Sequence, residues 1–181
     1  EFTSNANYGF IIFDSHLDTA VDVDGDPWNH CCPVPRVLET GVFNSQNTVL
    51  VGMGGAMNPK AEMEYVRDKG LSLFTSRDIY KDGIIEVTKK AVEIASKGTD
   101  GVYITFDMDA LEACYTPGTC APTPGGMTTR EMIQAIDILG QVNLIGFDVA
   151  EIAPPYDHSD ISALTGARFI VDMLASRARY L

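Results

Sequence analysis

Basic side chains are scarce in this sequence. It has 13 lysines and arginines against 25 aspartates and glutamates, which gives a formal net charge of −12. Binding to nucleic-acid phosphates or to an anionic membrane surface requires clustered lysine and arginine side chains. The composition therefore argues against a nucleic-acid or membrane partner and favours metal cations or a cationic substrate.

Long apolar runs are also missing. No stretch of the sequence approaches the roughly 20 apolar residues that would span a bilayer. The overall composition is nevertheless that of a globular protein, with 45% hydrophobic and 21% charged residues. A chain of 181 residues is long enough for a substantial core, so we expect one domain or a large part of one.

Cysteines are few, and none belongs to a C-x-x-C pair. Of the four, Cys31 and Cys32 are adjacent and are therefore poor partners for a disulfide, and Cys114 and Cys120 lie far along the chain. This usage is typical of free thiols in a reducing cytosol. We therefore expect a cytoplasmic protein.

Strand-like and helix-like segments alternate along the chain. Short apolar runs predict strands at Tyr8–Phe13, Thr48–Gly52, Leu71–Thr75, Gly101–Phe106 and Val142–Phe147. Helical spacing predicts helices at Pro59–Lys69 and Asp82–Lys97, after a capping box at Thr128, and from Ser159 or Asp160 to about Arg177. Such alternation predicts an α/β fold with a mainly parallel sheet and helices on both faces.

In parallel sheets of this kind, sites form beyond the carboxyl ends of the strands. The first predicted strand is followed by Asp14, His16 and Asp18, which alternate, so an extended backbone would direct all three to one side. The fourth predicted strand ends in Asp107 and Asp109, which also share a side. Each aspartate could instead be a turn or cap residue, but the same pattern at two strand ends argues against that alternative.

Four aspartates crowded at strand ends would repel one another unless cations neutralise them. Two divalent cations carry a charge of +4, which offsets the four carboxylates, and they would also activate a bridging water as hydroxide. Oxygen-rich ligation with a little imidazole suits manganese better than zinc or copper. The sequence therefore predicts a site for two Mn²⁺ ions.

Three motifs resemble those of the ureohydrolase family, which includes arginase and agmatinase. The first is Asp14–Thr19 (Asp-Ser-His-Leu-Asp-Thr). The second is Thr105–Asp109 with the Pro/Gly-rich segment Thr116–Gly126, and the third is Gly146–His158, which is most similar to bacterial agmatinase. The resemblance spans nearly the whole chain and implies a three-layer α/β/α fold with a binuclear manganese centre.

The resemblance also implies metal ligands and a reaction. Asp14 and Asp107 would bridge the two metals, Asp18 would complete the set of one, and His16 and Asp109 would serve the other. A metal-bridging hydroxide would attack the guanidinium carbon, and Asp109 would pass a proton to the leaving amine. The products would be urea and an amine.

Three further residues take roles from the same resemblance. Glu151 stands where the family holds the substrate's guanidinium, and a carboxylate pairs well with planar N–H donors. His30 stands where the family has a proton-shuttling histidine, and His158 belongs to the third motif and is expected near the site entrance. The alternatives are a solvated loop residue for Glu151 and a surface loop histidine for His30.

The sequence departs from the family pattern at three places. It has no upstream Gly-Gly-Asp-His motif, whose histidine binds the first metal in the family. Residues 1–181 are therefore expected to be the C-terminal larger part of a single, N-terminally truncated ureohydrolase domain. Glu112-Ala113 replaces the usual Asp-Pro, and Gly52–Ala56 has no carboxylate where arginase grips the α-amino group of its substrate. Agmatine is therefore the first choice, ahead of guanidinobutyrate and arginine.

Other functions remain as alternatives. Gly52–Gly55 loosely resembles a dinucleotide loop but lacks the full G-x-G-x-x-G spacing, and Cys31-Cys32 has no partner arrangement for a cysteine nucleophile. A non-catalytic metal-binding or assembly module that keeps the fold is the main rival. The family resemblance further implies a homo-oligomer, a trimer or a hexamer.

Overall fold

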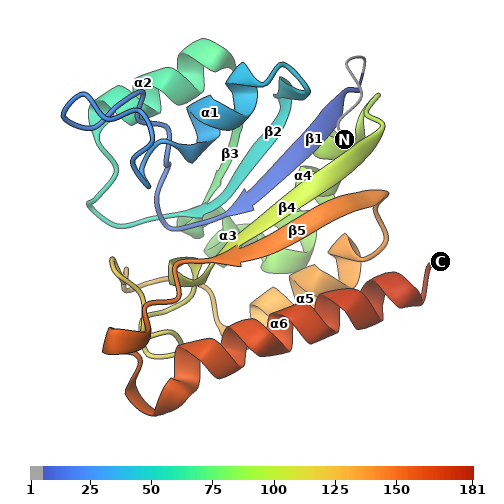
Figure 1. Cartoon of the computed structure of the whole chain (residues 1–181). Helices are drawn as coiled ribbons and strands as arrows, with labels where there is room; N and C mark the ends of the chain where they lie inside the picture. Colours follow the sequence, from blue (N-terminus) through green and yellow to red (C-terminus); the bar gives the residue numbers. More distant parts are fainter. Residues whose placement is uncertain (1–5) are drawn as a thin grey trace.

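The computed structural model describes residues 6–181, which contain one parallel sheet of five strands (Figure 1). The strands are β1 Tyr8–Phe13, β2 Phe43–Met53, β3 Ser72–Thr75, β4 Gly101–Asp107 and β5 Leu144–Ala150. Their order across the sheet is β3-β2-β1-β4-β5, and each neighbouring pair is parallel. The sheet expected from the alternating sequence pattern is therefore confirmed.

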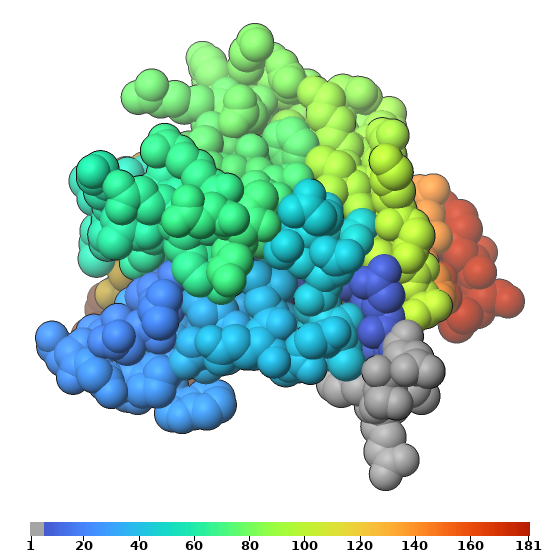
Figure 2. Space-filling view, turned by 90° about the horizontal axis from the view of Figure 1, so that it is seen from above, coloured from blue at the N-terminus to red at the C-terminus, as the bar shows by residue number. Residues whose placement is uncertain are grey.

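Helices cover both faces of this sheet. They are α1 Pro33–Glu39, α2 Lys60–Lys69, α3 Ser76–Asp82, α4 Ile84–Ser96, α5 Thr129–Leu139 and α6 Ile161–Ala178. Figure 1 shows α1 and α2 on one face and α3 to α6 on the other, which makes three layers. Figure 2 looks down on the first face, where α2 lies beside the segment 15–40.

The alternation of side chains along β1 divides the core between the two faces. Ile11 and Phe13 are buried in the cluster formed with α4, α5 and α6, whereas Phe10 and Ile12 are buried in the cluster formed with α1 and α2. A strand that is buried on both faces reads as a continuous apolar run, which is how the sequence identified it. β1 is thus the central strand of the sheet, as its continuous apolar run indicates.

The layer formed by α1 and α2 does not reach across the whole sheet. Every residue of β5 is partly or fully exposed, whereas β1 is almost entirely buried. A cavity of about 570 Å³ lies on this face, between α1 and the side chains of β4 and β5 that point towards it. The cavity runs from the aromatic side chains of Phe10, Phe43 and Tyr103 to the carboxyl ends of the strands.

Several element boundaries differ from those expected. β2 begins at Phe43, five residues before the apolar run, because Phe43 packs its ring against Phe10. α1 was not expected, because the sequence pattern predicts no helix between the first two strands. The helix predicted at Asp82–Lys97 is α4, which begins at Ile84. The helix before it, α3, was not expected, and Gly83, with a φ of 83°, separates the two.

The N-terminus of α6 is capped by a different residue from those predicted. Neither Ser159 nor Asp160 makes a capping hydrogen bond; the carboxylate of Asp157 accepts hydrogen bonds from the backbone N–H groups of Ser162 and Ala163, both at 2.9 Å. Burial raises the pKa of Asp157, but these hydrogen bonds together outweigh it, so the pKa lies below its usual value. Among the described residues, no helix is both long and apolar enough to cross a lipid bilayer.

The capping box at the start of α5 provides a test of the fold. The Thr128 hydroxyl accepts from the Glu131 N–H, and the Glu131 carboxylate accepts from the Thr128 N–H. We expect Thr128→Ala to lower the free energy of unfolding by about 1 kcal/mol in urea denaturation. Thr129→Ala is the matched control, with an expected change within about 0.5 kcal/mol. Equal losses in the two variants would contradict this account of the helix start.

Candidate metal centre

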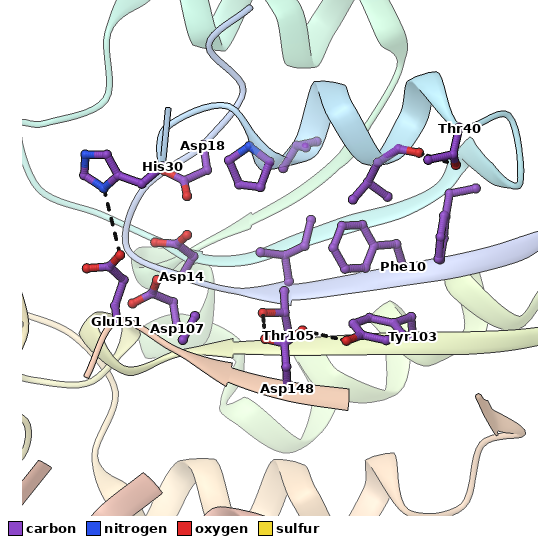
Figure 3. A pocket seen from close by; sticks show the side chains of 16 residues that line it. Phe10, Asp14, Asp18, His30, Thr40, Tyr103, Thr105, Asp107, Asp148 and Glu151 are labelled. Carbon is purple, nitrogen blue, oxygen red and sulfur yellow. Dashed lines mark hydrogen bonds and ion pairs between the residues drawn. The ribbon is translucent and has the colours of Figure 1, made fainter. Parts of the chain in front are cut away.

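The register of the parallel strands places acidic residues side by side. Phe13 of β1 is the register partner of Phe106 of β4, so the next residues, Asp14 and Asp107, end adjacent strands. On its other side Asp107 pairs with Ala150 of β5, and Glu151 follows. Three neighbouring strands thus deliver carboxylates to one edge of the sheet, as Figure 3 shows for these side chains.

The alternating pattern had led us to expect an extended backbone at this edge, but the backbone there is not extended. β1 ends at Phe13, and Asp18 has a φ of 50° in the left-handed region. Asp109 lies in a short 3-10 turn, η1 Met108–Ala110, in which its N–H donates to the Asp107 carboxylate at 2.9 Å. Turns rather than strand alternation therefore bring these carboxylates together.

The tightest group of ligand-type atoms comprises Asp14, His16 and Asp109. One ligand atom from each lies within 4.8 Å of the others. The His16 Nδ1 atom is 3.1 Å from Asp109 Oδ2 and 3.5 Å from Asp14 Oδ1. Ser15 holds Asp109 in place, because its hydroxyl donates to Asp109 Oδ1 at 2.9 Å and its N–H donates to the same atom at 3.2 Å.

Burial gives this cluster unusual electrostatics. Burial, with the charges of Asp14 and Asp109 next in importance, raises the pKa of Asp107 to about 10. Burial likewise raises the pKa of Asp14 to about 7 and, with help from the Asp14 charge, that of Asp18 to about 8. Hydrogen bonds to Asp109 and Asp14 raise the pKa of His16 to about 10. The protein without cations therefore holds repelling carboxylates that favour protons.

These residues fit divalent cations. His16 Nε2 is buried and has no hydrogen-bond partner within residues 6–181, so part of this imidazole is left unsatisfied by the protein itself. In the described part of the chain, no lysine or arginine lines either of the two cavities at this edge. Carboxylate oxygens with one imidazole are the donors that hard or borderline divalent cations prefer. The residues that could hold them are Asp14, His16, Asp18, Asp107 and Asp109.

His30 and Glu151 lie across the cavity mouth from each other. The His30 Nδ1 atom is 3.9 Å from Glu151 Oε1, and both residues line the two cavities that meet at the carboxylates (Figure 3). Glu151 has a φ of 58°, a conformation that glutamate seldom adopts and that aims its side chain off the end of β5. The His30 side chain is 66% exposed, so its ring can exchange protons with water.

The structure does not bring every candidate to this edge. His158 is exposed in the short turn η3 His158–Asp160 and lines neither cavity, so its place at the site entrance stays a prediction. Cys31 and Cys32 are free thiols, and burial raises the pKa of both. A thiol with a raised pKa is a poor nucleophile near neutral pH, which argues against the cysteine alternative.

Sequence reasoning missed a polar group on the open face of the sheet. Asp148 of β5 accepts hydrogen bonds from the Tyr103 hydroxyl at 2.8 Å and from the Thr105 hydroxyl at 2.6 Å, both on β4. Burial and the bond to Asp148 raise the pKa of Tyr103 to about 12. This network ties β4 to β5 just before Asp107 and Glu151. Position 148 is part of the third motif, but only the strand register reveals its partners.

Sequence reasoning also missed Glu62, which lies in the first turn of α2. Its side chain lines the smaller cavity, of about 180 Å³, together with His16, Asp18 and Glu151. Glu62 follows closely after Gly52–Ala56, where the sequence analysis found no carboxylate. No local sequence pattern indicates that this turn of α2 faces the carboxylates, so the sequence alone did not identify Glu62.

Comparisons with known proteins agree on one family. The sequence matches the Arginase family over residues 2–175. It is 30% identical to the guanidinopropionase of Pseudomonas aeruginosa over 92% of this chain and 34% identical to the agmatinase of Chromobacterium violaceum over 90%. Among solved structures, the formimidoylglutamase of Bacillus subtilis has a TM-score of 0.90 and 27% identity over 97% of this chain.

The same comparisons show what fraction of each relative's length this chain matches. The chain covers 52% of the guanidinopropionase, 47% of the agmatinase and 54% of the formimidoylglutamase. It therefore spans about half the length of these relatives. The matched half contains the carboxylate cluster, His30 and Glu151.

Asp107 allows a test of the electrostatic account. In the presence of a chelator at neutral pH, we expect Asp107→Asn to raise the melting temperature. Burial and the neighbouring carboxylates force Asp107 to take up a proton when the chain folds, and the neutral amide avoids that cost. The same variant should lose most of the rise in melting temperature that Mn²⁺ gives the unaltered chain, because a ligand is gone. Differential scanning calorimetry measures both effects.

Glu93→Gln, on the exposed side of α4, is the control for this experiment. It should change neither the melting temperature in chelator nor the response to Mn²⁺. An Asp107→Asn variant that is less stable in chelator than the unaltered chain would contradict this electrostatic account.

Proposed function

The chain belongs to the arginase family, and from that membership we propose that the protein hydrolyses a guanidino compound, agmatine first among the candidates, to urea and an amine in a manganese-dependent reaction. The observation that carries the proposal is the convergence of five ligand-type side chains beside the His30–Glu151 pair at one edge of the sheet. Relatives named agmatinase and guanidinopropionase support the reaction class.

The donor set supports two manganese ions. Asp14 and Asp107 end adjacent strands and would be shared between the metals, with Asp18 on one and His16 with Asp109 on the other. When bound, such a pair of cations would supply a water molecule acidified enough to attack an electrophilic carbon near neutral pH. Hard oxygen donors with one imidazole favour manganese over softer metals.

The remaining steps belong to the protein's own side chains. Glu151 would accept hydrogen bonds from the planar N–H groups of the guanidinium and orient its carbon towards the metal ligands. Asp109 would hold a proton on a carboxylate oxygen and deliver it to the leaving amine nitrogen. His30, exposed and 3.9 Å from Glu151, would carry a different proton, the one released when the next water molecule is activated, from the site to bulk water.

We further propose that residues 1–181 form the C-terminal larger part of a single ureohydrolase domain. The chain spans about half of each relative, and the sheet face beside β5 is open. A trimeric or hexameric assembly and a cytoplasmic location stay predictions.

One observation favours a rival function. Among the described residues, the only group of three or more ligand-type side chains close enough for one ion is Asp14, His16 and Asp109. A chain that binds a single ion here would be a metal-binding or assembly module that keeps the fold but not the chemistry.

Urea release decides between the two functions. The longest natural chain that contains these residues would be assayed with and without Mn²⁺ on agmatine, guanidinobutyrate, guanidinopropionate and arginine. We expect Mn²⁺-dependent urea release, fastest from agmatine. One bound metal per chain with no urea from any substrate would support the non-catalytic rival.

Glu151→Gln tests the guanidinium contact in the same protein. The amide keeps the shape but removes the charge that pairs with the guanidinium, so kcat/KM for urea release should fall at least about 100-fold. Glu86→Gln, at an exposed pair with Lys89 on α4, should leave kcat/KM unchanged. Bound manganese, measured by atomic absorption, should be the same in both variants. An active Glu151→Gln enzyme would remove Glu151 from the proposed site.

A further inference from the structure

Glu62 is a carboxylate at the metal-side cavity to which neither the metal set nor the guanidinium contact assigns a role. It belongs to α2, in the helical layer above the sheet, whereas the carboxylates of Asp107 and Glu151 rise from strand ends. The same cavity of about 180 Å³ is lined by Glu62 and by Glu151. Glu62 therefore faces the place where a substrate held by Glu151 would lie.

Two hydrogen bonds anchor Glu62 to the first motif. The Thr19 N–H donates to Glu62 Oε2 at 3.2 Å, and the Thr19 hydroxyl donates to the Glu62 carbonyl oxygen at 3.0 Å. Thr19 is buried and directly follows Asp18, so the position of Glu62 is coupled to that of a metal-ligand candidate. The first turn of a helix also stabilises a negative charge there.

Within residues 6–181, Glu62 has no lysine or arginine beside it, and His16, whose charge acts on Glu62 in the metal-free protein, would be neutral as a metal ligand. Neither lysine nor arginine lines the cavity, and none of the ion pairs within residues 6–181 includes Glu62. The nearest lysine along α2, Lys60, pairs with Glu64 on the exposed side at 3.0 Å. A half-buried carboxylate without a cation is costly unless a ligand supplies one.

The charge balance of the site indicates what that ligand carries. Two divalent cations would offset the four aspartates Asp14, Asp18, Asp107 and Asp109. Glu151 and Glu62 then leave a charge of −2 at the cavity, and one guanidinium offsets only half of it. A second positive group on the substrate would neutralise the remaining charge of −1.

We propose that Glu62 is a specificity-determining residue that receives a second cationic group at the far end of the substrate. The inference rests on the proposed function and makes it more specific. It favours guanidino-amines, such as agmatine, as substrates over guanidino acids. A carboxylate tail would meet Glu62 as a like charge, which is a repulsive element that selects between the two classes.

The kinetic test compares charged and uncharged tails. In the manganese-loaded enzyme, Glu62→Gln should lower kcat/KM for agmatine roughly 10-fold to 100-fold, mainly through KM. The rate with butylguanidine, which has the same chain length and no second charge, should stay within about twofold. The glutamine can still accept the Thr19 N–H bond, so a general structural role would not separate the two substrates. Glu64→Gln, two residues away and exposed, is the control.

A binding test keeps the inference separate from the hydrolysis. Butane-1,4-diamine and butylamine would be titrated calorimetrically into the manganese-loaded protein. The unaltered protein should bind the diamine more tightly, and Glu62→Gln should abolish that preference while leaving butylamine binding unchanged.

Three results would overturn the assignment of Glu62. They are equal losses for agmatine and butylguanidine, no preference for the diamine, or faster hydrolysis of guanidinobutyrate than of agmatine. The absence of urea from every substrate would instead refute the proposed function, and a diamine preference that depends on Glu62 would still stand.

Discussion

Repulsion among carboxylates at the carboxyl ends of β1, β4 and β5 is the constraint on which the rest of this structure depends. Parallel register places Asp14, Asp107 and Glu151 at the ends of three adjacent strands, and turns add Asp18 and Asp109. Within residues 6–181, no lysine or arginine shares their cavities. The fold must therefore hold these groups together until cations from outside neutralise them. Burial, with the neighbouring carboxylates second, raises the pKa values of Asp14, Asp18 and Asp107, which is the cost of this arrangement.

The rest of the fold supplies the rigidity that this arrangement needs. Phe13 and Phe106, the residues just before Asp14 and Asp107, stack against each other, and both rings are fully buried. Ser15 clamps Asp109, and Asp148 joins the hydroxyl groups of β4 to β5 just before the site. Side chains that are fixed in this way cannot move apart to relieve their repulsion. Binding energy from cations can then be spent on neutralising the charges and not on ordering the ligands.

The two faces of the sheet are covered to different degrees by helices. The face with α3 to α6 is closed by a large apolar cluster, whereas the opposite face leaves β5 partly exposed and a cavity running from Phe10 to Asp107. Within the described chain, β5 has a strand partner on one side only. Exposed strand edges favour further pairing, which agrees with a chain that spans about half the length of its relatives.

The sequence by itself determined the local elements and the chemistry they could carry. Apolar runs located all five strands, a capping box located α5, and the motifs around Asp14, Asp107 and Glu151 identified the family. These signals are readable because strands, caps and motifs depend on neighbours along the chain. The helix α3 before Gly83 and the early start of β2 were missed, since tertiary packing sets such elements and boundaries. Only the tertiary structure decided which side chains meet. Strand register and the turns after it set the distance from His30 to Glu151, the anchoring of Glu62 by Thr19 and the partners of Asp148, because residues far apart in sequence make those contacts.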